Sequence, residues 1–183
     1  MSEHLLSFFR YCPVCGQQKI RFDEKKSIRC GQCGLIYYSN PAGAVAALIF
    51  DDKGRLLFTR RAHDPAKGSL DLPGGFIDPM ENAEEALIRE IREELGIELS
   101  KIKYAGSIDN RYQYAGVTYH TIDLIFLCKV ENFDHMKAGD DITSFEFRNI
   151  NETSPDEVGL ESLRKVFIKL KSGAYSGMLS DFI

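Results

Sequence analysis

The most regular hydrophobic pattern in the chain lies between Asn82 and Leu95. This segment contains no glycine or proline, and most of its residues are acceptable helix formers. Asn82 is a suitable N-cap, and Gly96 can end a helix in the left-handed conformation. At roughly 100° per residue, the apolar side chains fall on one stripe, formed by Ala83, Ala86, Leu87, Ile91 and Leu95. The pattern therefore predicts an amphipathic helix with one buried face.

Apolar runs elsewhere predict several strands and one further helix. The expected strands cover residues 44–50, 55–61, 102–111, 117–130 and 143–147, and apolar residues recur at helical spacing over 159–171. We expect the turn sequence at residues 51–54 to join the first two strands as a hairpin, and Ala115-Gly116 to join the third and fourth. This order predicts a mixed sheet flanked by helices. The 183 residues, of which 44% are hydrophobic, suffice to bury a core.

Acidic residues interrupt the apolar stripe of the helix predicted for residues 82–95. Glu90 and Glu94, one turn apart, fall within or at the edge of the stripe, with Glu93 beside them. A run of this kind is commonly a solvated acidic face. The apolar stripe argues against a solvated face in this helix, because carboxylates near a buried face cost free energy unless a cation compensates their charge. The opposite side of the helix carries residues that we expect to face water, namely Glu85, Arg89 and Arg92.

A hard divalent cation with oxygen ligands supplies the required compensation. We therefore expect Glu90, Glu93 and Glu94 to bind Mg²⁺, with Mn²⁺ as a substitute. Gly74 and Gly75 precede the helix and let the backbone approach the same ion closely, so that Gly75 is a further candidate ligand through its carbonyl oxygen.

Residues 75–97 read GFIDPMENAEEALIREIREELGI and fill every fixed position of the spacing G-x5-E-x7-R-E-U-x-E-E-x-G-U, where U is aliphatic. This segment resembles the Nudix box. The resemblance implies an α/β/α sandwich with a mixed sheet, and a hydrolase that uses a divalent metal to cleave the pyrophosphate of a nucleoside diphosphate linked to another group. It also implies that Arg89 orients a neighbouring glutamate. We expect Glu81 to support the metal site without binding the ion directly.

Cleavage of a phosphoanhydride needs charge neutralisation and an aligned water more than a nucleophilic side chain. Many relatives of this family use a further carboxylate that is distant in the sequence. Asp140 and Asp141 are the candidates by position, with Asp141 preferred and Glu146 as the alternative. An acidic surface loop explains the same aspartates equally well. His63 and His120 could contact substrate, but a single histidine in a strand or loop is more often a simple polar residue.

Two C-x-x-C pairs lie near the N-terminus, Cys12 with Cys15 and Cys30 with Cys33, and a glycine follows each pair. Four thiolates at such spacing can close a tetrahedral zinc site. The first ten residues lack an apolar core long enough for a signal peptide, so we expect a cytoplasmic protein without disulfides. Redox chemistry suits one such pair better than two. The pattern favours a structural zinc ribbon.

A zinc ribbon that leads into a Nudix domain is similar to the arrangement in NADH pyrophosphatases and related proteins. We place the ribbon at residues 1–40 and the Nudix domain at 41–183, with Ser39-Asn40-Pro41 as the boundary. This chain lacks the SQPWPFPxS motif of NADH pyrophosphatases and contains no tryptophan, so we do not expect NADH to be its preferred substrate. Tyr112 and Tyr114 lie where diadenosine polyphosphate hydrolases place a tyrosine. They either stack on a base or are ordinary sheet aromatics.

The net charge of −4 argues against general nucleic-acid binding. Residues 10–29, however, contain six basic and two acidic residues, a local charge of +4. A second hypothesis is therefore that the ribbon binds RNA or a partner protein, while the Nudix domain acts on, or only recognises, a nucleotide-capped end. A ribbon that only stabilises the fold or a dimer is the simpler interpretation and the one we favour. No apolar stretch is long enough to cross a membrane, and a homodimer is possible because many relatives form one.

Overall fold

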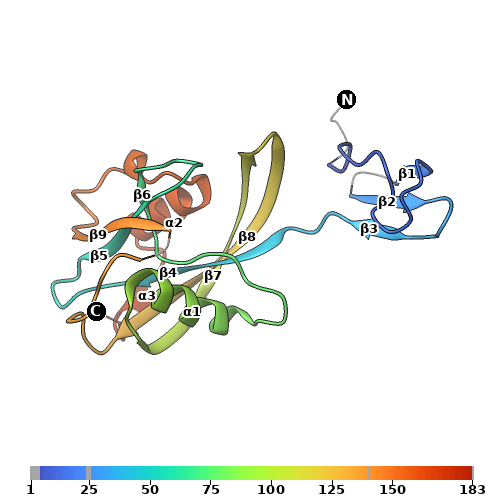
Figure 1. Ribbon diagram of the computed structural model, residues 1–183. Coiled ribbons are helices and arrows are strands. Elements are labelled where there is room, and N and C mark those ends of the chain that lie inside the picture. Colours follow the sequence, from blue (N-terminus) through green and yellow to red (C-terminus); the bar gives the residue numbers. More distant parts are fainter. Residues whose placement is uncertain (1–4, 24–25, 140, 183) are drawn as a thin grey trace. The chain divides into compact units, whose positions relative to one another are not determined.

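The computed structural model describes residues 5–23, 26–139 and 141–182, without the side chains of Tyr112 and Gln113 (Figure 1). The chain divides into two compact units, Met1–Pro41 and Ala42–Ile183. None of the helices in the described ranges has the length and apolar character that a membrane-spanning helix needs.

The first unit contains a small antiparallel sheet in the order β1-β2-β3. Both cysteine pairs form tight turns. Gly16 and Gly34 each have a positive φ and donate a backbone hydrogen bond to the first cysteine of their pair, at 2.9 Å to Cys12 and 3.1 Å to Cys30. Such turns favour glycine, because other residues rarely adopt this conformation. The strands are β1 (Ile20–Asp23), β2 (Ser27–Cys30) and β3 (Ile36–Tyr38).

The second unit contains two three-stranded sheets. In the first, ordered β4-β8-β7, β4 runs parallel to β8 and β7 runs antiparallel to it, so the sheet is mixed as expected. The second is antiparallel in the order β6-β5-β9. The strands are β4 (Ala42–Ile49), β5 (Leu56–Arg61), β6 (Leu70–Asp71), β7 (Leu99–Tyr114), β8 (Val117–Val130) and β9 (Ile142–Arg148).

The hairpin predicted between the first two strands of this unit is wrong. The chain does reverse at residues 51–54, where the Asp51 carboxylate accepts hydrogen bonds from the backbone N–H of Lys53 and of Arg55. β4 and β5 share only one bridge, between Phe50 and Leu56, and then enter different sheets. The last five residues of β4 and the first four of β5 are all buried, so these parts are buried on both faces and pair with other strands.

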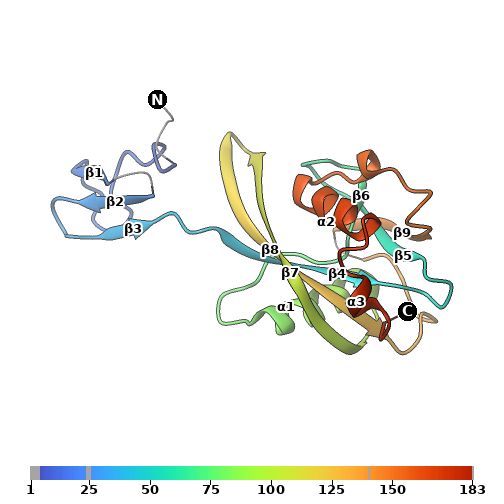
Figure 2. The same ribbon diagram turned by 180° about the vertical axis from the view of Figure 1, so that it is seen from behind.

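The helices cover opposite sides of the sheets (Figures 1 and 2). α1 (Ala83–Leu95) packs with Val45, Ala47 and Ile49 of β4 in one core cluster, and α2 (Glu161–Lys171) packs with Ala46 and Leu48 in the other. This arrangement confirms the sandwich that the Nudix resemblance implied. A 3-10 helix (Pro155–Glu157) and a short α3 (Ser176–Leu179) complete the unit.

The predicted boundaries of α1 are also confirmed. The Asn82 side chain accepts a hydrogen bond from the N–H of Glu85, whose carboxylate in turn accepts one from the N–H of Asn82. Gly96 ends the helix with a φ of 67°. This capping box satisfies backbone donors that the first helical turn would otherwise leave unpaired.

Candidate active site

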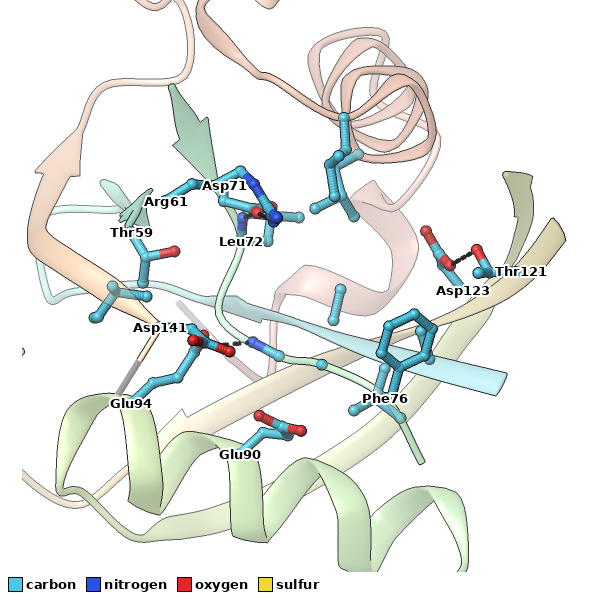
Figure 3. Close-up of a pocket in the computed structure, with 18 of the residues that line it drawn as sticks. Thr59, Arg61, Asp71, Leu72, Phe76, Glu90, Glu94, Thr121, Asp123 and Asp141 are labelled. Atoms are coloured by element: carbon cyan, nitrogen blue, oxygen red, sulfur yellow. Dashed lines mark hydrogen bonds and ion pairs between the residues drawn. The ribbon is translucent and has the colours of Figure 1, made fainter. Parts of the chain in front are cut away.

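A cavity of about 540 Å³ lies in the second unit (Figure 3). Its wall is formed by residues of β4, β5, α1, β7, β8 and α2 together with the turn that precedes α1. Side chains that are far apart in the sequence therefore meet here.

The turn before α1 depends on two adjacent glycines. Gly74 has a φ of 143°, and a Cβ at this position would collide with the carbonyl oxygen of Val45. A Cβ at Gly75 would collide with the carboxylate of Glu90. The carbonyl oxygen of Gly75 accepts a hydrogen bond of 2.8 Å from the N–H of Val45, which holds the turn against β4. The glycines thus bring the backbone directly beside the glutamates of α1.

Glu94 is the most buried of these glutamates, with only 6% of its surface exposed. Its Oε2 accepts a hydrogen bond of 3.0 Å from the N–H of Gly74. The pKa of Glu94 is raised to about 8, mainly by burial. The carboxylates of Asp71, Glu90 and Asp141 add to this rise, and the hydrogen bond from Gly74 offsets part of it. The site therefore gathers negative charge in a poorly hydrated place, and a cation there would stabilise it.

Arg89 does not face water as the helical pattern suggested, since only 27% of its side chain is exposed. Its guanidinium group donates to both carboxylate oxygens of Glu81 at 2.9 Å, to Glu90 at 2.9 Å and to Glu93 at 3.0 Å. It also donates to the carbonyl oxygen of Phe76 at 2.9 Å. The hydrogen bonds with Glu81, and then those with the other glutamates, raise the pKa of Arg89. The long side chain curls back over its own helix because three carboxylates attract it.

The predicted site residues divide into two groups. Glu93, whose side chain is 46% exposed, and Glu81 contact Arg89 but do not line the cavity. Neither do His120 and Glu146, and the latter is bound to Arg60 and Arg148 at 2.6 and 2.9 Å. The residues that line the cavity are Gly75, Glu90, Glu94, Tyr114, Asp141 and His63.

Two of the predicted residues fall outside the described part of the structure, namely Asp140 and the side chain of Tyr112. Asp141 is exposed, and its carboxylate lies 3.5 Å from Nε2 of His63. The ring of Tyr114 lies edge-to-face with that of Tyr119, at 6.4 Å between centroids.

Several polar residues of the cavity were not predicted from the sequence. Arg61 forms an ion pair of 2.5 Å with the buried Asp71, and its Nε donates to the carbonyl oxygen of Pro65 at 2.7 Å. Buried polar side chains also line the wall on β5 at Thr59, on β7 at Asn110, and on β8 at Thr121 and Asp123. Their one sequence signal is a polar residue at an inward position of an otherwise apolar strand, as at Asp123 in TIDLIFLC.

The four cysteines of the first unit converge as predicted. Their sulfurs all lie within 4.8 Å of one another, with Cys12 and Cys33 3.6 Å apart and Cys15 and Cys30 3.7 Å apart. These separations exclude disulfides, in which the sulfurs lie about 2.05 Å apart. They fit a zinc ion with four sulfurs at about 2.3 Å, whose sulfurs would lie about 3.8 Å from each other.

The electrostatics of the cysteine cluster also fit a cation. Hydrogen bonds from the backbone N–H groups of Cys33 and Gln32 lower the pKa of Cys30 to about 6, which favours its thiolate. The N–H of Gln17 lowers the pKa of Cys15, but burial and the neighbouring sulfurs outweigh it and raise that pKa to about 12. Crowded thiolates repel one another unless a metal ion lies between them. Among the described residues, this is the only group of three or more metal-ligating side chains that converges so closely.

Residues 40–170 match the model of the NUDIX domain, and the chain belongs to this family. It is 33% identical over 136 residues to the ADP-ribose pyrophosphatase of Methanocaldococcus jannaschii, covering 74% of this chain and 78% of that protein. It is 25% identical over 169 residues to the NAD-capped RNA hydrolase NudC of Pseudomonas putida, covering 92% of this chain but only 58% of that protein. A NUDIX hydrolase from Nitrosomonas europaea has a similar fold, with a TM-score of 0.66, 20% identity, and coverage of 90% and 94% of the two chains.

Proposed function

We propose that the protein hydrolyses the pyrophosphate bond of a nucleoside diphosphate linked to another moiety, and that it requires Mg²⁺ or Mn²⁺. The observation that carries this proposal is the buried Glu94, which faces the cavity together with Glu90 and has Asp71 and Asp141 close enough to raise its pKa. A divalent cation would relieve this repulsion, and the glycine turn leaves room for substrate oxygens beside it.

Glu90 and Glu94 would hold the ion, and Glu93 would join them when its exposed side chain turns inward. The carbonyl oxygen of Gly75 is a further donor, because the hydrogen bond from Val45 occupies only one of its lone pairs. When bound, the ion supplies positive charge to the pyrophosphate oxygens and to the attacking water. Mg²⁺ keeps several waters, so the protein carboxylates need not converge as tightly as the cysteines do.

Two further residues would support this site. Arg89 positions Glu90 and Glu93 and neutralises part of the charge of the helix without reaching the cavity itself. Asp141 lines the cavity beside His63 and would act as an additional metal ligand or as the base that accepts a proton from water.

An ADP-ribose type of compound is the substrate that we favour. The support is the similarity to the M. jannaschii ADP-ribose pyrophosphatase over most of both chains. The absence of tryptophan and of the SQPWPFPxS segment argues against NADH as the preferred substrate. In this proposal the cysteine cluster holds one structural Zn²⁺ in a ribbon domain, with the boundary near Pro41.

A second candidate substrate is NAD-capped RNA. The alignment with the P. putida NAD-capped RNA hydrolase covers 92% of this chain, and the first unit exposes tyrosines and carries a local charge of +4 over residues 10–29. RNA contacts through such a surface would weaken steeply with salt.

A substrate panel with Mg²⁺ tests both candidates. It comprises ADP-ribose, NADH, diadenosine polyphosphates, nucleotide sugars, coenzyme A, deoxynucleoside triphosphates and NAD-capped RNA. We expect ADP-ribose to give AMP and ribose 5-phosphate, with turnover abolished by a chelator and restored by Mg²⁺ or Mn²⁺. The second candidate would be favoured instead if the cap were released from RNA faster than free NADH is hydrolysed, and if high salt removed this difference in rate. No metal-dependent turnover of any of these compounds would contradict the proposal.

A further inference from the structure

A polar patch lies on the cavity-facing side of β7 and β8. Asn110 of β7 is directly opposite Thr121 of β8, and Asp123 follows two residues further along β8 on the same face. All three residues are buried, with Asn110 8% and Asp123 5% exposed, although all three line the cavity. The glutamates of α1 lie across the cavity from this patch (Figure 3).

One oxygen of Asp123 is fixed and the other is open. The Thr121 hydroxyl donates a hydrogen bond of 2.7 Å to Oδ1 of Asp123. No described residue donates to Oδ2, and none bonds to the side-chain amide of Asn110. Among the described residues, the Ser162 hydroxyl is the one polar side-chain atom that is both enclosed and without a hydrogen-bond partner. The unpaired atoms of Asn110 and Asp123 are therefore not enclosed, and they reach the cavity. A carboxylate this deeply buried is costly unless its open oxygen accepts a hydrogen bond, and a ligand can supply the donor.

The surroundings of the patch suit a flat heteroaromatic ring. Ala44 pairs with Asp123 in the parallel ladder, and its other neighbour is Phe76, whose ring is exposed. Leu160, which precedes α2, and Leu163 of α2 form an apolar wall of the same cavity. A small side chain at Ala44 leaves space, and an exposed aromatic ring offers a stacking surface.

We infer that the open oxygen of Asp123 accepts a hydrogen bond from the 6-amino group of an adenine ring, while the amide of Asn110 donates to the adjacent ring nitrogen. This inference rests on the proposed function and names the residues that would recognise the adenine of an ADP-ribose type of substrate. A single open oxygen suits the one amino group of adenine. Guanine carries a carbonyl oxygen in place of this amino group, and in the same pose that oxygen would face the open carboxylate oxygen and repel it.

The test is a binding measurement that needs no turnover. AMP lacks a pyrophosphate bond and can be titrated calorimetrically into the full chain with Mg²⁺ present. Purine riboside 5′-monophosphate is the matched ligand without the 6-amino group, and GMP is the competing base. We expect the wild-type protein to bind AMP at least about tenfold more tightly than either, because each alternative leaves the buried oxygen unpaired or mismatched.

Asp123→Asn should remove this preference by weakening AMP binding to the level of purine riboside monophosphate. Asp109→Asn is the matched control, because it makes the same chemical change next to Asn110 but at a side chain that is 98% exposed. This variant should keep the preference for AMP. The affinity for Mn²⁺, followed by electron paramagnetic resonance, should be unchanged in Asp123→Asn. A fall in Mn²⁺ affinity would make Asp123 a metal ligand and overturn the inference.

Equal binding of AMP and purine riboside monophosphate to the wild-type protein would overturn the inference, and this comparison requires no variant to fold. Tighter binding of GMP would overturn it as well. A different result would contradict the proposed function, namely the absence of metal-dependent hydrolysis across the substrate panel. The binding of AMP can still be measured and interpreted in that case.

Discussion

The backbone N–H of Gly74 donates a hydrogen bond of 3.0 Å to the carboxylate of Glu94, twenty residues further along the chain. This contact joins the glycine turn to the metal-binding face proposed for α1. It places a buried carboxylate at the cavity wall and fixes the backbone beside it.

Arg89→Lys should lower kcat by about tenfold or more while leaving KM for ADP-ribose nearly unchanged. A lysine ammonium cannot hold Glu81, Glu90 and Glu93 together in the planar geometry of a guanidinium group. Arg92→Lys is the control, because Arg92 lies on the same helix and pairs only with the exposed Glu98. Steady-state kinetics with Mg²⁺, together with Mn²⁺ titration, measure both effects. Wild-type kinetics and Mn²⁺ affinity in Arg89→Lys would refute the positioning role.

Elemental analysis of the purified protein should find one Zn²⁺ per chain. Cys30→Ser should lose it, lower the thermal stability and make residues 1–41 sensitive to proteolysis, because binding energy in such small sites is largely folding energy. Cys128→Val is the control, since Cys128 is buried in the core of the other unit and should not affect zinc content.

Hydrolysis should survive in Cys30→Ser wherever the second unit remains folded. If zinc removal abolished turnover while the circular dichroism and thermal transition of the second unit were unchanged, the metal would have more than a structural role.

Tyr114→Ala should raise KM more than it lowers kcat, as expected when a stacking contact made equally in the ground and transition states is lost. The tyrosine lines the cavity, and 54% of its surface is exposed. ADP-ribose should exceed NADH in kcat/KM for the wild-type protein. An unchanged KM in Tyr114→Ala would show that Tyr114 is an ordinary sheet aromatic, and clear preference for NADH would show that the missing tryptophan motif is dispensable.

Stability should fall with acid through a second cluster, away from the cavity. Burial raises the pKa of Glu146, but hydrogen bonds from Arg148 and Arg60 outweigh it and leave that pKa below its ordinary value. The hydrogen bond from Arg148 likewise lowers the pKa of Glu157. A carboxylate whose pKa is lowered by folding stabilises the folded state when the pH is above its ordinary pKa of 4.5. This contribution to stability is lost as the pH falls below 4.5.

The measurement is the melting temperature of the wild-type protein and of Arg148→Gln between pH 6 and pH 3. We expect the curve of the variant to be lower at pH 6 and shallower below pH 4.5, because the partner that depresses both pKa values is absent. Parallel curves would contradict the assignment.

The sequence predicted α1 well because its period, its caps and its composition all agree. The helical pattern alone could not predict the direction of Arg89, since helical phase fixes where a side chain starts and not where a long one ends; the contact of Arg89 with neighbouring glutamates was implied only by the Nudix resemblance. The hairpin between β4 and β5 failed for a related reason: turn residues at 51–54 fix a chain reversal, whereas strand pairing depends on the rest of the sheet. Asp71, Asn110 and Asp123 meet the glutamates only through tertiary packing, which no local pattern contains.

The central claim is that Glu94 holds the catalytic metal ion, and the most direct test is the rate of Mg²⁺-dependent ADP-ribose hydrolysis by Glu94→Gln. The amide oxygen keeps an acceptor for the N–H of Gly74 but removes the charge, so the fold should persist. Glu84→Gln, at an exposed position of the same helix, is the control. The account predicts a fall in kcat of at least about a hundredfold for Glu94→Gln and none for the control. Near-normal turnover by a folded Glu94→Gln would contradict it.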